Sequence, residues 1–212
     1  GTISAISTHP AHIITTGGGG VLFTDEDEIA YRAVSIRDWG RIVDFERRKA
    51  SYGECPADYR RYIYGQLGSN YHPLELQAAM GRIQLKRLSE FKRIRARNAN
   101  VLKRIFAPFK DRMILPSYDP RADVCWYTYP ITLRNIQRKK VLSALDRANI
   151  EWRPILAGNI ARQPAFRDYV KVRNNTPNAD LLISNSFWVS VHPLHSIEVM
   201  EYVGNTIKNA IA

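Results

Sequence analysis

Cysteine is scarce in this chain, which has only Cys55 and Cys125 among its 212 residues. Two thiols are too few for a disulfide framework or for a four-thiolate metal site. Histidine offers no substitute, because His9 and His12 have no third ligand nearby at a recognised spacing. We therefore expect no metal site and a reducing, cytoplasmic setting.

Long apolar runs and low-complexity tracts are also missing. No stretch approaches the ~18 consecutive apolar residues of a transmembrane helix, so no membrane span is expected. An initiator methionine is absent as well, and the chain opens directly on a strand-like stretch, GTISAIS. This opening favours a fragment of a longer protein.

Acidic residues are in the minority: 20 Asp and Glu stand against 31 Lys and Arg, a formal net charge of +11. A basic surface is typical of proteins that meet nucleic acid or phosphorylated small molecules. Here the basic residues spread through helical stretches such as 86–104 and form no single patch interleaved with aromatics. We expect a solvated face and no nucleic-acid partner, with a nucleic-acid binder kept as the weaker alternative.

Apolar residues recur with strand and helix periods in alternation, which predicts a layered α/β fold. The predicted strands are 2–7, 21–24, 124–133, 151–155 and 187–191. The predicted helices are 24–40, about thirty residues from Pro73 with a bend or break near Ser89, 135–150, 178–186 and 196–211. The last has Met200, Val203, Ile207 and Ile211 on one stripe. Residues 41–71 are expected to form a long loop or short helices.

Local signals set the predicted boundaries. Thr24 or Asp25 is the expected cap of the first helix, Gly40 its stop, and Asn135 the cap of a later helix. The stretch APFKDRMILPSYDP divides the chain into two predicted domains, 1–108 and 109–212.

The opening loop, STHPAHIITTGGGG, holds most of the candidate chemistry. Its glycines, Gly17 to Gly20, let backbone approach a ligand closely, and Ser7, Thr15 and Thr16 offer hydroxyl groups. This is neither a Walker loop nor a dinucleotide fingerprint, because the required spacing is missing. A phosphate cradle and a tight turn between two strands both stay open from the residues alone.

Read whole, the loop and three later stretches resemble the DegT/DnrJ/EryC1/StrS sugar aminotransferase family. The loop pattern SxxPxHxxTTGxGG is followed by VLFTDEDEIAYRAVSIRDWGR, and the later stretches are GSNYHPLELQAAMGRIQLKRLSEF, RPILAGNIARQPAF and NSFWVSVHPLHSIEVMEYV. The resemblance implies the C-terminal half of a fold-type I transferase dependent on pyridoxal phosphate (PLP). That half is the end of the large cofactor domain plus a small α/β domain.

One position departs from the family pattern. His12 stands where the family has the lysine that binds PLP covalently. An imidazole cannot form that stable linkage, but it titrates near neutral pH and suits general base work. The resemblance is therefore nearest to the nucleotide-deoxysugar 3-dehydratases, which hold PLP or pyridoxamine phosphate (PMP) noncovalently.

This branch implies C3 dehydration of a nucleotide-linked 4-keto-6-deoxyhexose for deoxysugar and lipopolysaccharide biosynthesis, with His12 as the base at C4′ of the cofactor. A nucleotide-sugar aminotransferase and a catalytically inactive or regulatory fragment of the family stay open as alternatives.

The resemblance also implies roles for five further residues. Ser7 and Asn70 are expected to contact the cofactor phosphate, Asn70 across the interface of a homodimer with a shared active site. Arg153, Asn159 and Arg162 are expected to contact the nucleotide sugar. The plain alternatives are a strand-end hydroxyl, a turn asparagine and surface ion pairs.

An iron–sulfur cluster is not expected. One version of the branch carries its cluster on cysteines that include a Cys-x-Cys pair after a segment like RDWGR. Here Ile42 and Val43 stand near that position, and Cys55 is the cysteine left in the loop. Because a cluster needs four protein ligands, the cysteines favour the version without one, although the segments resemble the version that has it.

Overall fold

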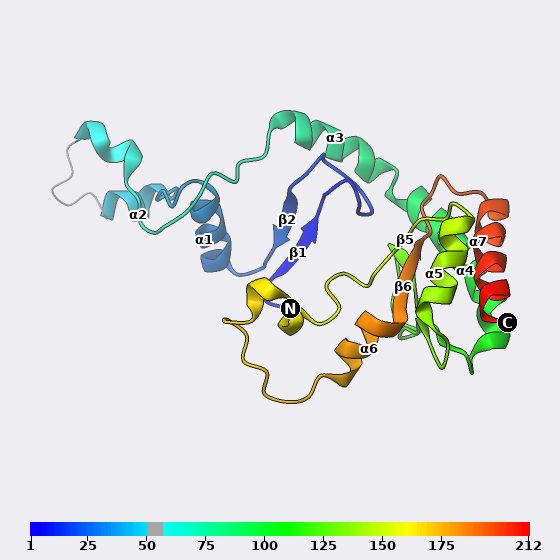
Figure 1. The fold of residues 1–212 in the computed structure, drawn as a ribbon. Helices are drawn as coiled ribbons and strands as arrows, with labels where there is room; N and C mark the ends of the chain where they lie inside the picture. The colour runs from blue at the N-terminus through cyan, green and yellow to red at the C-terminus, as the bar shows by residue number, and fades with distance from the viewer. Residues whose placement is uncertain (51–56) are drawn as a thin grey trace. The chain divides into compact units, whose positions relative to one another are not determined.

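A computed structural model describes residues 1–50 and 57–212, so Cys55 falls outside the described residues. The chain forms two compact units, Gly1–Leu88 and Ser89–Ala212 (Figure 1), each of which is described by itself. The sequence placed the domain boundary at residue 108 instead. The difference lies in α4 (Leu88–Phe106), whose buried residues Ala99, Leu102 and Phe106 belong to the core of the second unit.

The first unit consists of a hairpin and helices. The hairpin pairs β1 (Ser4–Ser7) with β2 (Gly20–Phe23) antiparallel, with Ser7 opposite Gly20. The helices are α1 (Asp27–Arg37), α2 (Phe45–Ala50), the 3-10 helix η1 (Ala57–Tyr62) and α3 (Glu75–Lys86). The hairpin joins the two ends of the loop that holds Ser7 and His12.

The apolar side chains of the hairpin and of α3 are largely exposed. Ile6 is 54% exposed and Phe23 51% exposed, and α3 has no buried residue, with Ile83 at 58%. A two-stranded hairpin is at best marginally stable alone. Apolar surface of this kind is typical of elements that pack against further protein.

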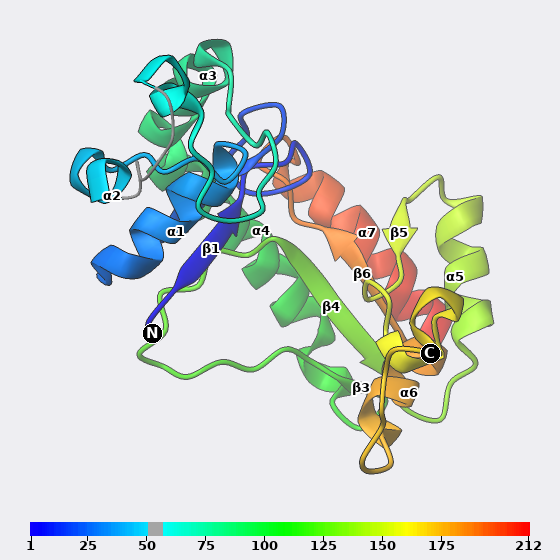
Figure 2. The same ribbon diagram turned by 90° about the vertical axis from the view of Figure 1, so that its left-hand side faces the viewer.

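An antiparallel sheet forms the centre of the second unit, with strand order β3-β4-β6-β5. Its strands are β3 (Met113–Ile114), β4 (Thr128–Leu133), β5 (Trp152–Arg153) and β6 (Ser186–Ser190). Besides α4, the helices of the second unit are η2 (Ala107–Phe109), α5 (Arg138–Arg147), η3 (Ile160–Arg162), η4 (Pro164–Phe166), α6 (Pro177–Asn185) and α7 (Ile197–Ile211). Helices α4, α5 and α7 cover one face of the sheet (Figure 2).

The core of the second unit follows the sequence periods. Along β4 every second residue is buried: Tyr129, Ile131 and Leu133. On α7 the predicted stripe of Met200, Val203, Ile207 and Ile211 is buried and therefore confirmed. Within the described residues, no helix combines the length and the apolar character that a membrane crossing requires.

Two predicted helix caps are wrong. The N-cap of α1 is Glu26, and the Thr24 hydroxyl instead accepts a hydrogen bond from the Glu26 N–H. The N-cap of α5 is Gln137, because Asn135 adopts a positive φ of 53° in the preceding turn. The bend or break predicted near Ser89 is a break at Arg87, between α3 and α4.

A buried arginine distinguishes the second unit. Arg95 on α4 is 3% exposed, and its Nη1 donates to the carbonyls of Trp126 (3.2 Å) and Tyr127 (2.9 Å). Within the described part of the chain, no carboxylate pairs with it. The pKa of His192 and that of His195 are lowered from 6.5, first because burial disfavours the charged ring and second because Arg95 repels another positive charge.

The lowered histidine pKa values predict a loss of stability in mild acid. As the pH falls below about 6.5, the unfolded chain takes up protons before the folded chain does. The free energy of unfolding should therefore decrease as the pH is lowered. We expect this fall to be smaller in the double variant His192→Asn, His195→Gln, which keeps hydrogen-bonding atoms in place of Nδ1 and Nε2. Denaturant unfolding of the whole protein across about pH 5 to 8 measures it, and equal slopes in both proteins contradict it.

Candidate functional site

Thr8 organises the loop between β1 and β2. It is the one buried residue of the loop, at 4% exposed. Its N–H donates to the Gly19 carbonyl (3.0 Å), its carbonyl accepts from the Thr16 N–H (3.0 Å), and the hydroxyls of Thr8 and Thr16 lie 2.7 Å apart. The Thr15 hydroxyl also donates to the Thr8 carbonyl (3.1 Å). These four loop groups are therefore tied to one residue next to Ser7.

Glycines permit the return of the loop to β2. Gly17 and Gly19 have φ values of 80° and 94°, which side chains other than glycine rarely adopt. A Cβ on Gly20 would lie 2.7 Å from the Ile6 carbonyl oxygen, so β2 can approach β1 here only without a side chain.

Ser7 and His12 flank a tight turn. The Ser7 Oγ accepts from the His9 N–H (3.2 Å), and the His12 N–H donates to the His9 carbonyl (2.9 Å). The His9 Nδ1 accepts from the Ala11 N–H (3.2 Å), and the rings of His9 and His12 lie 6.0 Å apart, edge to face. Both Ser7 and His12 are exposed. The turn therefore presents a hydroxyl group and an imidazole at the surface of the first unit.

Asn70 lies on a second loop of the first unit. It forms an isolated bridge with Asp38, and its Oδ1 accepts from the His72 N–H (3.3 Å). Glycines hold this loop against the end of α1, since a Cβ on Gly68 would lie 2.3 Å from the Gly40 nitrogen. The amide of Asn70 is exposed, and one of its atoms already serves the turn.

Asn159 and Arg162 meet at one carboxylate, that of Asp180 on α6. Asn159 is 4% exposed; its Nδ2 donates to Asp180 Oδ1 and to the Thr176 hydroxyl, both at 2.8 Å. Its Oδ1 accepts from the Ala161 N–H (3.2 Å), which caps η3. Arg162 binds both oxygens of Asp180, through Nε at 2.5 Å and Nη2 at 2.6 Å.

The Asp180 carboxylate is strongly stabilised in its charged form. The hydrogen bonds from Arg162 and then Asn159 lower the pKa of Asp180 from 3.8 to about 2. A group with a lowered pKa stabilises the folded state fully above its ordinary pKa and loses that contribution as the pH falls through about 2. The contact is therefore complete at neutral pH.

Arg153 lies apart from that network, on β5. Its guanidinium pairs with Glu151 two residues earlier, and its side chain is 61% exposed. The backbone of Arg153 pairs with Trp188 on β6. Of the three residues expected at the nucleotide sugar, the structure thus joins Asn159 and Arg162, and it places Arg153 in a separate ion pair.

The sequence predicted no role for two residues, Thr8 and Asp180, that organise the two sites. Thr8 carries no motif of its own, and its burial is visible only once the loop is folded. Asp180 is 18 positions from Arg162, and no local pattern links the two. In the part of the chain that the structure describes, no group of three or more His, Cys, Asp or Glu is placed to hold a metal ion.

The two units together define part of a fold-type I PLP-dependent transferase, as the sequence predicted. One solved structure with this fold is a crystal structure of GDP-4-keto-6-deoxymannose-3-dehydratase with a trapped PLP–glutamate geminal diamine. It matches with a TM-score of 0.82 and 25% identity, over 98% of this chain and 55% of that chain.

Residues 1–208 match the DegT/DnrJ/EryC1/StrS aminotransferase family, and the chain belongs to this family. The lipopolysaccharide biosynthesis protein RfbH of Salmonella typhimurium is 33% identical over 96% of this chain and 50% of its own length. The dTDP-4-dehydro-2,6-dideoxy-D-glucose 3-dehydratase of Saccharopolyspora spinosa is 31% identical over 100% of this chain and 49% of its own length. The chain spans about half the length of these relatives.

Replacing Asp180 by Asn should loosen the segment around η3. The variant loses the two-point contact with Arg162, although an amide oxygen stays within reach of Asn159. We expect several-fold faster backbone hydrogen exchange over residues 158–176 at neutral pH, measured by mass spectrometry on the whole protein.

Asp119→Asn is the matched control, because Asp119 also binds an arginine, Arg121, through both oxygens. This variant should leave exchange over 158–176 unchanged. Unaltered exchange in Asp180→Asn, or an equal rise in both variants, contradicts the role given to Asp180.

Proposed function

We propose that the whole protein, of which this chain represents part, removes the C3 hydroxyl from a nucleotide-linked 4-keto-6-deoxyhexose with the help of PLP or PMP. The observation that carries the proposal is His12, an exposed imidazole five positions after Ser7. The resemblance aligns this position with the lysine that binds PLP in the family. The names of the relatives, a lipopolysaccharide biosynthesis protein and a sugar 3-dehydratase, support the same substrate class. We place the reaction in cytoplasmic deoxysugar biosynthesis.

The donor groups of the loop fit a cofactor that carries a phosphate. The Ser7 oxygen accepts one hydrogen bond from the His9 N–H, which leaves its O–H to donate to a phosphate oxygen. The Thr8 network holds the strand end that carries Ser7. Asn70 would supply an amide donor from the partner subunit of a homodimer, a contact that the family resemblance implies.

When bound, PLP or PMP supplies an electron sink next to the carbon that is deprotonated. His12 would accept the proton from C4′ of the cofactor and hold it on its ring. The hydrogen bond between the His12 N–H and the His9 carbonyl fixes the backbone from which the imidazole projects. Because an imidazole makes no stable linkage to the cofactor, retention depends on contacts such as those from Ser7 and Asn70.

Replacing His12 by Asn should abolish most of the dehydration while the cofactor stays bound. Loss of a general base costs about 10²- to 10⁴-fold in rate. The whole protein is given PMP and nucleotide-linked 4-keto-6-deoxyhexoses, and loss of the C3 oxygen is followed by mass spectrometry. Absorbance after desalting reports the bound cofactor.

His9→Asn is the control, since Asn Oδ1 can accept from the Ala11 N–H as His9 Nδ1 does. It should retain most of the activity. Full activity in His12→Asn would refute the role of His12. An amino sugar that keeps its C3 oxygen identifies an aminotransferase, and absence of cofactor absorbance identifies a catalytically inactive relative.

A further inference from the structure

We infer that the pocket between η3 and residues 170–176 binds the diphosphate of the nucleotide sugar through Lys171 and Arg173. This inference rests on the proposed function for its substrate class. It gives a role to residues 170–176, for which the sequence analysis made no functional prediction.

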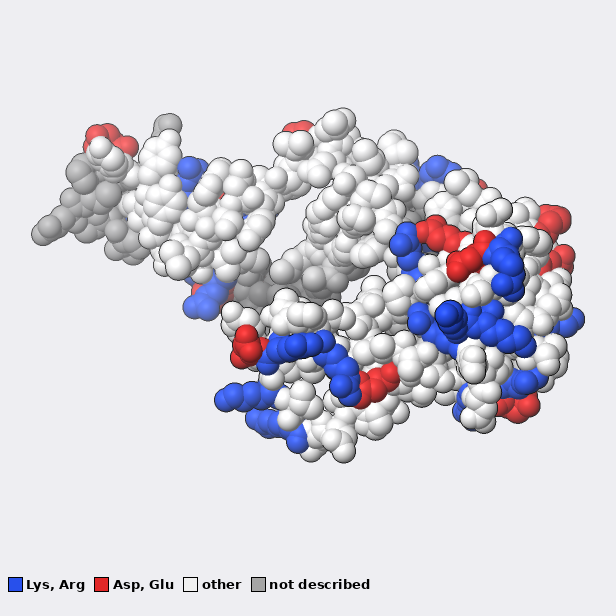
Figure 3. Space-filling model, in the orientation of Figure 1, with Lys and Arg blue, Asp and Glu red and all other residues white. Residues whose placement is uncertain are grey.

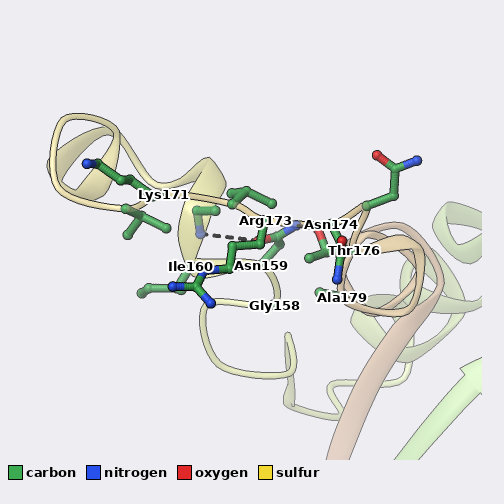
Figure 4. Close-up of a pocket in the computed structure, with 12 residues that line it drawn as sticks. Gly158, Asn159, Ile160, Lys171, Arg173, Asn174, Thr176 and Ala179 are labelled. Carbon is green, nitrogen blue, oxygen red and sulfur yellow. Dashed lines mark hydrogen bonds between the residues drawn. The ribbon is translucent and has the colours of Figure 1, made fainter.

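The pocket has a volume of about 520 Å³, within the ~300–1,000 Å³ typical of ligand sites. One wall is the turn from Gly158 to Ala161, and the other is the segment 170–176 (Figure 4). Arg173 extends from this segment toward Ile160, whereas the side chain of Lys171 points away from Arg173, toward the left of the view. The pocket is lined by 12 residues, of which none is acidic.

The charges of the expected substrate residues are already compensated. Asp180 binds Arg162 through both oxygens, and Glu151 pairs with Arg153. Within residues 1–50 and 57–212, no carboxylate forms an ion pair with Lys171 or Arg173. Basic side chains gather over this part of the second unit in Figure 3. Two basic side chains without a carboxylate partner among the described residues therefore line the pocket, together with Asn159.

Asn159 holds the two walls of the pocket together. Its Nδ2 donates to the Thr176 hydroxyl at the end of the segment 170–176, and its Oδ1 accepts from the Ala161 N–H in the opposite wall. Thr176 is also the N-cap residue of α6, but the side chain of Thr176 makes no hydrogen bond that caps this helix.

The lining matches a nucleoside diphosphate better than a bare phosphate. Lysine and arginine are suited to phosphate oxygens, and the amides of Asn174 and Asn175 can donate further hydrogen bonds. Ile160, Val170 and Val172 supply apolar area for a base or a ribose. Such a site would recognise the nucleotide end of the substrate, whereas the chemistry occurs at the sugar.

The double variant Lys171→Gln, Arg173→Gln should bind nucleoside diphosphates at least ~10-fold more weakly, because two charge-assisted hydrogen bonds are lost. Calorimetric titration of the cofactor-loaded whole protein with GDP, dTDP, UDP and CDP measures the loss directly. Inorganic pyrophosphate serves as the probe without a nucleoside. In the dehydration assay, KM should rise while kcat and cofactor absorbance stay near those of the unsubstituted protein.

Lys103→Gln, Lys110→Gln is the matched control. It removes the same charge from a different pocket of the second unit, with a volume of about 630 Å³, and it should leave the affinity unchanged. Equal affinity in the Lys171, Arg173 variant, an equal loss in the control, or no binding of any of the four nucleotides overturns the inference. If pyrophosphate binds as tightly as the nucleotides, the pocket does not recognise the base or the ribose. If the protein dehydrates the sugar but the Lys171, Arg173 variant binds nucleotides with unaltered affinity, the inference is wrong and the proposed function still holds.

Discussion

The hydrogen bonds of Thr8 are the constraint on which the candidate cofactor loop depends. One buried residue ties Thr15, Thr16 and Gly19 to the end of β1, so the loop closes on itself without a helix or a sheet of its own. Closure costs conformational entropy, and several bonds to one anchor offset it. As a result, a hydroxyl group and an imidazole project from a fixed backbone although both side chains are exposed.

In the second unit, Asp180 has a comparable role. Its carboxylate joins Asn159 and Arg162, and through them the η3 turn, to α6. This contact also decides where positive charge is available. An arginine held by a carboxylate is already neutralised, whereas a cation that faces a pocket without an acid retains its attraction for phosphate. Ion pairing within the protein thus shifts the expected anion site from Arg162 to the neighbouring segment.

The two units differ in how well they bury their apolar residues. The second unit has its own core, with Leu102, Phe106 and Ile207 fully buried. The hairpin and α3 of the first unit bury almost none of theirs, which agrees with a chain that spans about half the length of its relatives. The first unit carries the candidate chemistry, and its exposed apolar surface is typical of elements that pack against further protein.

The sequence by itself determined the family, the fold class and most of the elements, because apolar periodicity and contiguous motifs such as the Ser7–Gly20 loop are local. The stripe on α7 and the break after α3 follow from such patterns. Tertiary structure alone decided the partners of Asn159 and Arg162, the burial of Thr8 and of Arg95, and the position of Lys171 and Arg173 along one pocket. Each of these depends on groups brought together from distant positions, and a pattern in one chain records spacing along the backbone but not which side chains meet.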